Sequence, residues 1–73
     1  RDRFEFSEGD GRDRILDWRD GERIVFDSGP DGFRDLTLRE RGGDVVIVYG
    51  RGDVIRVEDA DLGDLSARDF IFA

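Results

Sequence analysis

The absence of both cysteine and histidine constrains this chain most, because its 73 residues are few for a stable fold. A domain of this size buries only about 60% of its unfolded surface, and it usually needs a disulfide, a metal or a partner. Without cysteine no disulfide can form, and zinc lacks its preferred ligands. Oxygen ligands remain, since the chain has 19 Asp and Glu residues, and these suit hard cations such as calcium.

The formal net charge of −7 narrows the range of partners. An acidic chain repels nucleic-acid phosphates and anionic lipids, so we expect no nucleic-acid partner. No segment approaches the roughly 20 apolar residues of a membrane span, so we expect no membrane insertion. The chain opens without Met and without an apolar signal sequence, and we expect it to be a fragment.

Short apolar runs separated by turn residues predict an all-β fold. Phe4 and Phe6 alternate with charged residues, and residues 24–26 (Ile-Val-Phe) form an apolar run. Runs of this length that end at Gly, Pro or Asp are typical of strands. Residues 28–32 (Ser-Gly-Pro-Asp-Gly) predict a loop by their turn chemistry.

The centre of the chain predicts an antiparallel meander with strands at 36–39, 45–49 and 54–57. Gly42 and Gly43 can supply the positive φ that a tight turn between the first two strands needs. The middle segment is β-branched or apolar on both faces, which suits a central strand. Phe33 lies in the loop before the meander, and we expect it to fold back onto it.

The last residues predict a helical turn followed by a strand. Ser66 followed three residues later by Asp69 has the form of a helix start. Phe70, Ile71 and Phe72 then predict a final strand with the two Phe side chains on its inward face. Replacing Asp69 with Ala is expected to leave that packing nearly intact.

Residues 8–16 (Glu-Gly-Asp-Gly-Arg-Asp-Arg-Ile-Leu) match the nonapeptide G-G-x-G-x-D-x-U-x at all but its first position. This pattern is the calcium-binding repeat of RTX proteins, and the chain resembles that family here. The glycines permit tight turns that bring backbone carbonyls towards an ion, and the aspartate adds a charged oxygen. The spacing of Asp and apolar residues also resembles the family at residues 2–6, 11–18 and 21–24.

The resemblance implies calcium as a cofactor. In the family an ion lies between the loops of stacked turns, so a single repeat supplies only part of a site. Arg12 and Arg14 depart from the family pattern. A guanidinium beside the loop either weakens cation binding by charge repulsion or points outward. The implied ligand residues are Asp13 as the best carboxylate, then Asp10, Asp2, Gly9 and Gly11.

Residues 60–72 (Ala-Asp-Leu-Gly-Asp-Leu-Ser-Ala-Arg-Asp-Phe-Ile-Phe) resemble the A-D-L-T-A-x-D-F-I-F endings of RTX proteins exported by type I secretion systems. In those proteins an uncleaved export signal lies at the carboxy terminus, where an acidic residue often precedes apolar ones. The resemblance implies a secretion signal, a type I exporter as partner and an extracellular, secreted location. The implied signal residues are Asp69, Phe70, Ile71 and Phe72.

We therefore expect one all-β domain over residues 1–73, the end of a parallel β-roll capped by antiparallel strands. Residues 1–27 would form terminal β-roll turns and 28–58 the meander. Residues 59–73 would form a capping turn, the last strand and the secretion signal. The resemblance implies a carboxy-terminal, calcium-responsive capping and type I secretion-signal module of an RTX-type protein, with the upstream RTX repeats of the parent chain as its other partner.

Other interpretations fit parts of the sequence. A stand-alone acidic β-module could bind a protein partner through a strand edge. Residues 51–53 spell the integrin tripeptide Arg-Gly-Asp at a predicted hairpin tip, although Gly and Asp are ordinary turn residues. Close acidic pairs such as Asp10 and Asp13 are expected by frequency in so acidic a chain, so we expect no enzyme. Trp18 is expected to pack in the core.

Overall fold

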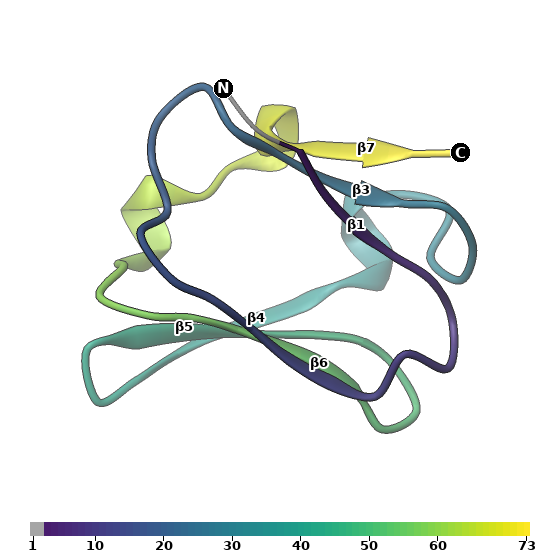
Figure 1. The fold of residues 1–73 in the computed structure, drawn as a ribbon, viewed down its shortest axis with the longest axis horizontal. Helices are drawn as coiled ribbons and strands as arrows, with labels where there is room; N and C mark the ends of the chain where they lie inside the picture. Colours follow the sequence, from purple (N-terminus) through teal and green to yellow (C-terminus); the bar gives the residue numbers. More distant parts are fainter. Residues whose placement is uncertain (1–2) are drawn as a thin grey trace.

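The computed structural model describes residues 3–73, which form two β-sheets and three single-turn 3-10 helices (Figure 1). Among these residues, no helix is both long and apolar enough to cross a membrane. In chain order the elements are β1 (Arg3–Phe6), β2 (Arg12–Ile15), β3 (Arg23–Phe26), η1 (Phe33–Asp35), β4 (Thr37–Arg41), β5 (Asp44–Gly50), β6 (Asp53–Val57), η2 (Leu62–Asp64), η3 (Ala67–Asp69) and β7 (Phe70–Phe72).

The first three strands make one coil around the core, which Figure 1 shows as the chain passes from β1 through β2 to β3. β2 begins nine residues after the start of β1 and lies in the opposite sheet. β3 then returns to the first sheet and pairs in parallel with β1, with Arg23 opposite Arg3. Strands that alternate between two sheets and stack in parallel are the geometry of a β-roll, as the nonapeptide spacing predicts.

The first sheet has the order β1-β3-β7, and its strands all run in parallel. β3 is the central strand, and three of its four residues are buried. The strand pairing continues past the strand ends, because the amide of Asp27 donates to the Phe6 carbonyl and the amide of Ala73 to the Phe26 carbonyl. The last strand of the chain therefore occupies the place of a further coil in this sheet.

The second sheet has the order β2-β6-β5-β4. β2 pairs with β6 in parallel, whereas β6, β5 and β4 are antiparallel neighbours, so the predicted meander is confirmed. Gly42 and Gly43, with φ of 56° and 87°, form the predicted tight turn between β4 and β5. The pairing therefore extends to Arg41 opposite Asp44, beyond the predicted strand ends.

The core fills the space between the two sheets and confirms the all-β fold class. The Phe26 ring is fully buried, with ring centroids 4.8 Å from Tyr49 and 5.6 Å from Phe72. Trp18 packs on Phe4 at the margin of the core, as expected. The largest fully buried side chains are Phe26, Ile15, Ile24, Ile47, Ile55, Val45 and Val57.

Phe33 in η1 has an aromatic neighbour in the last strand. Its ring centroid lies 5.4 Å from that of Phe70 in β7, and the side chain stays partly exposed. Contact of Phe33 with the meander stays a prediction. The final strand thus shares in covering the loop that precedes β4.

Candidate functional site

The loop at residues 7–11, which joins β1 to β2, is the predicted calcium loop. Gly9 and Gly11 have φ of 91° and 82°, a region that other residues rarely adopt. The backbone amide of Gly9 donates to Oδ2 of Asp53 at 3.0 Å, and that of Gly11 donates to Oδ1 at 3.0 Å. The loop therefore directs two N–H groups at one carboxylate from the distant strand β6.

Asp53 is the first residue of β6 and is only 4% exposed. A buried carboxylate is costly unless hydrogen bonds replace the lost water, and here each oxygen accepts one amide bond. Backbone N–H groups of one turn that converge on an anion also form the nests that bind phosphates and other anions. Gly50 leaves room for this arrangement, because a Cβ at that position would lie 2.7 Å from Asp53 Oδ2.

Several other polar groups of the loop are also hydrogen-bonded. The carboxylate of Asp10 accepts from the Ser7 amide at 2.8 Å. The Ser7 carbonyl accepts from the Asp10 amide at 3.1 Å and from the Tyr49 hydroxyl at 3.4 Å. The Gly11 carbonyl accepts from the Val54 amide at 2.9 Å. These groups are thus hydrogen-bonded within the chain itself.

This hydrogen bonding does not suit a calcium ion in the loop. Calcium takes six to eight oxygen ligands, whereas this loop turns donor groups inward and uses the carbonyls of Ser7 and Gly11 elsewhere. Nor do three or more acidic side chains within residues 3–73 come together in a way that could hold a metal. The residues of this coil, as folded, do not fit the ion that the resemblance implies.

The structure separates the predicted ligand residues. Asp13 lies on β2 opposite Ile55, is half-buried, and accepts no hydrogen bond within the described part of the chain. Asp10 folds back onto Ser7, and Gly9 and Gly11 donate to Asp53 as described above. Asp2 lies outside the described residues.

That Asp53 contacts this loop was not predicted from the sequence. Its place in the Arg-Gly-Asp tripeptide suggested an exposed hairpin tip, and only Arg51 and Gly52 are exposed there. Both carboxylate oxygens of Asp53 face the loop at residues 7–11, so they are not available to an external receptor. No local pattern could reveal this partner, because the contact spans more than 40 residues.

Tyr49 lies beside this acidic region, with its side chain 4% exposed. Burial, followed by the negative charges of Asp53, Asp10 and Asp13, raises the pKa of Tyr49 to about 12. The phenol therefore stays protonated and can donate its hydrogen bond to the Ser7 carbonyl over a wide pH range.

The terminal segment is folded into the module. Asp69 is buried, and its Oδ2 accepts from the Ser66 amide at 2.8 Å, while the Asp69 amide donates to the Ser66 carbonyl at 2.9 Å. The rings of Phe70 and Phe72 stack on Phe26 with centroid distances of 6.2 and 5.6 Å. The predicted turn and strand are confirmed. That Asp69→Ala leaves the apolar packing nearly intact stays a prediction, and the loss of a buried hydrogen-bond acceptor is a separate cost.

The first coil also presents two open strand edges. β1 is an edge of one sheet and β2 an edge of the other, and each has a neighbour on one side only among the described residues. Because β1 and β2 follow one another in the same coil, the two edges lie at the same end of the stack (Figure 1). Unpaired edges of this kind are templates for strand addition.

This fold recurs in a solved structure. The chain is similar to the extracellular lipase LipA from Serratia marcescens, with a TM-score of 0.80 and 24% sequence identity. The match covers 97% of this chain and 12% of the lipase, so the chain spans a small part of that protein. At this identity the likeness shows the fold alone. The sequence matches no protein-family profile and no curated protein.

Proposed function

We propose that this chain is the carboxy-terminal capping module of an RTX-type secreted protein and that it carries a type I secretion signal. The observation that supports the cap is the pair of open edges on β1 and β2, which lie nine residues apart in one coil. A preceding coil with the same nine-residue spacing could add one strand to each edge. The upstream repeats of the parent chain are the proposed partner.

The opposite end of the module supports the same role. In the second sheet only β2 and β6 pair in parallel, because β5 runs antiparallel to β6. The parallel stacking of the roll therefore ends at β6. The amide of Leu62 in η2 donates to Oε2 of Glu40 in β4 at 2.9 Å, which holds η2 against the outermost strand. An array that ends this way avoids a long open parallel edge, and terminal units of repeat arrays commonly have such a closing function.

The proposal places calcium-responsive folding in the preceding coils and not in the loop at residues 7–11. That loop is filled by the Asp53 carboxylate. Asp13 remains a candidate for a site shared with a preceding coil, since its carboxylate has no hydrogen-bond partner among residues 3–73. The module would have no catalytic activity of its own, and an activity would belong to the attached part of the parent protein.

The secretion signal is proposed to be Asp69, Phe70, Ile71 and Phe72. Asp69 and Phe70 are buried in the folded module, so an exporter could contact them only in a chain that has not yet folded. Export before folding, and folding outside the cell, would reconcile the two uses of these residues. The likeness to part of an extracellular lipase supports a secreted parent.

A fusion tests the capping role. Nonapeptide repeats of the G-G-x-G-x-D-x-U-x type would be joined before Arg1, and far-UV circular dichroism and sedimentation would be followed during a calcium titration. We expect the repeats to fold as a monomer on calcium addition only when the module is present and folded. A module unfolded by Phe26→Ala is the control. If the repeats fold as well alone, or with the unfolded module, as they do with the folded module, the module is not a cap.

The same fusion tests the calcium ligand. Asp13→Ala should raise the calcium concentration at the folding midpoint, whereas the exposed Asp31→Ala should leave it unchanged. If both variants have the same calcium midpoint as the parent, Asp13 is not a ligand of the proposed shared site. The capping role would not be affected by that result.

A secretion assay tests the signal separately. The module would be fused to a reporter, expressed with a type I exporter, and its secreted amount measured against its intracellular amount. Asp69→Ala and deletion of residues 70–73 should both reduce export. Ser66→Ala disturbs the same turn but keeps the Asp69 carboxylate, so it should be exported normally. Normal export of Asp69→Ala and of the deletion would refute the signal without affecting the cap.

A further inference from the structure

The outward face of the four-stranded sheet is basic, although the protein is acidic. Residues that lie directly opposite one another on neighbouring strands project from the same face. The pairing of β2, β6, β5 and β4 therefore aligns two rows of side chains across the sheet. One row is Arg14, Arg56, Val46 and Arg39, and the next is Arg12, Val54, Val48 and Thr37.

We call this surface the arginine face, and it consists of Arg12, Arg14, Arg39, Arg41 and Arg56 around Val46, Val48 and Val54. Two acidic residues lie beside these five arginines, Asp44 opposite Arg41 and Glu58 paired with Arg14, so the surface carries a formal charge of +3. The whole chain carries −7, which leaves −10 for the remainder. Charge is thus strongly segregated, and the segregation follows the sheet face rather than the sequence.

Only part of this positive charge is neutralised within the described residues. Arg56 Nε lies 2.7 Å from Asp44 Oδ2, and Arg14 NH1 lies 3.2 Å from Glu58 Oε2. No other ion pair is found among residues 3–73, so Arg12, Arg39 and Arg41 have no carboxylate within 4.0 Å there. Arg14 also lies directly opposite Arg56, and like charges in that position destabilise a sheet. The ion pairs of Arg14 with Glu58 and of Arg56 with Asp44 offset this repulsion, which leaves Arg12, Arg39 and Arg41 as the arginines available to a partner.

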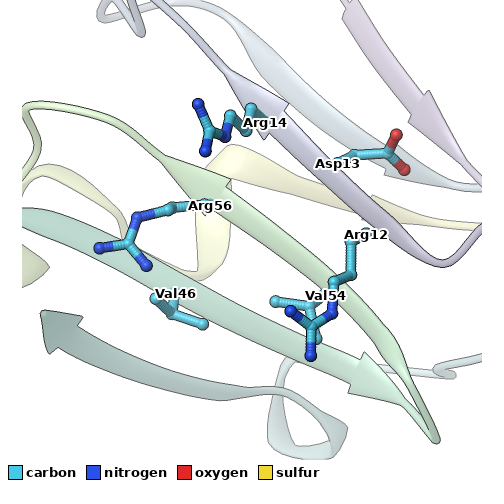
Figure 2. Close-up of a pocket in the computed structure, with 6 residues that line it drawn as sticks. All are labelled: Arg12, Asp13, Arg14, Val46, Val54 and Arg56. Carbon is cyan, nitrogen blue, oxygen red and sulfur yellow. The ribbon is translucent and has the colours of Figure 1, made fainter.

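The arginine face also has an apolar floor. Figure 2 shows the guanidinium groups of Arg12, Arg14 and Arg56 spread around Val46 and Val54, which line a hollow in the sheet surface. An adjoining hollow extends to Arg41 and Gly42. Val48 is 37% exposed in the same row as Val54. Arginine is one of the residues enriched in protein–protein interfaces.

We propose that the arginine face binds an extended acidic peptide segment that lies along its strands. Arg12 and Arg14, and likewise Arg39 and Arg41, are alternate residues of one strand, so their side chains recur about every 6.7 Å. Alternate carboxylates of an extended peptide recur at the same interval and can accept bidentate bonds from guanidinium groups. Apolar residues of such a peptide would lie over the valines.

Charge favours a peptide over an anionic membrane as the occupant. A narrow peptide contacts the arginine face and little else. A bilayer is a broad surface and would bring the remaining charge of −10 close to anionic headgroups. This inference goes beyond the proposed capping role, because the outward face of the sheet is not used by strand addition to β1 or β2.

Fluorescence anisotropy with a labelled peptide of alternating Glu and Val tests the inference. We expect saturable binding at low salt that weakens several-fold at ~0.15 M ionic strength. Arg12→Ser and Arg39→Ser should each weaken binding about twofold to fivefold, as for an exposed ion pair, and the double variant should weaken it further. Arg68→Ser, with the same change of charge at an exposed position in η3, is the control and should bind like the parent.

Two further probes decide the chemistry. A peptide with the same residues in a Glu block and a Val block should bind several-fold more weakly if the alternating spacing matters. Vesicles of phosphatidylglycerol should bind less than the alternating peptide. The inference fails if Arg68→Ser weakens peptide binding as much as Arg12→Ser, if the two peptides bind equally, or if only the vesicles bind. Unchanged thermal unfolding of each variant verifies that the fold is retained.

Discussion

The carboxylate of Asp53 accepts a hydrogen bond from the backbone amide of Gly11 at 3.0 Å, although the two residues lie 42 positions apart in the chain. Its second oxygen accepts from Gly9 at the same distance. Through this one side chain the meander is joined to the loop of the first coil. The contact therefore couples the two parts of the module that the sequence presents as separate segments.

Asp53→Ala should lower the free energy of unfolding by about 1–3 kcal/mol, because it leaves two loop amides without their acceptor. Urea denaturation followed by the fluorescence of Trp18, the single tryptophan, would measure the change. The exposed Asp27→Ala is the matched control and should stay within about 0.5 kcal/mol of the parent. Equal stability of both variants would show that the Asp53 contact contributes nothing net.

Gly50→Ala should destabilise the module by about 1–3 kcal/mol, because its new Cβ would lie 2.7 Å from Asp53 Oδ2 and displace the carboxylate from Gly9. Gly63→Ala is the control, since nothing lies within 4 Å of a Cβ there. In an Asp53→Ala background the cost of Gly50→Ala should largely vanish, which a double-mutant cycle by urea denaturation would detect. A cost that persists in that background would place the strain elsewhere.

Stability should fall at high pH through Tyr49. Its pKa is raised to about 12 in the folded state from 10.0, so the folded state favours the protonated phenol. This stabilisation is complete below pH 10 and is lost as the pH rises through 12. Tyr49 is the single tyrosine, so absorbance near 295 nm would report its ionisation directly. Tyr49→Phe should remove this part of the loss of stability at high pH. A phenol in the parent that titrates at the usual pKa of tyrosine would contradict the buried environment.

Asp69→Ala should destabilise the folded module by about 0.5–2 kcal/mol, the cost typical of a lost helix-terminal acceptor. The reason is that the Ser66 amide loses the Asp69 carboxylate. Thermal unfolding would measure the loss. Asp61→Ala is exposed but is not a suitable control, because Asp61 caps the turn at η2. Arg68→Ala, an exposed neighbour in η3, is the suitable control. No difference between the two variants would show that the turn forms without its acceptor.

Local sequence patterns were sufficient to predict most of the strands. Alternation at Phe4 and Phe6, the glycine pair at residues 42–43 and the Ser66 to Asp69 spacing each predicted the element that the structure contains. These features depend on backbone conformation and side-chain direction over a few residues, which the sequence specifies directly. The nine-residue step from β1 to β2 likewise follows from the nonapeptide pattern.

By itself, then, the sequence determined the strands, the turns and the all-β class of this protein. Only the tertiary structure decided what lies in the loop at residues 7–11, because a carboxylate 42 residues away competes for its amides. It also decided that arginines from β2, β6 and β4 share one face, since that depends on the register of paired strands. Partners so distant along the chain are chosen by the packing of the whole molecule, and no local pattern records that choice.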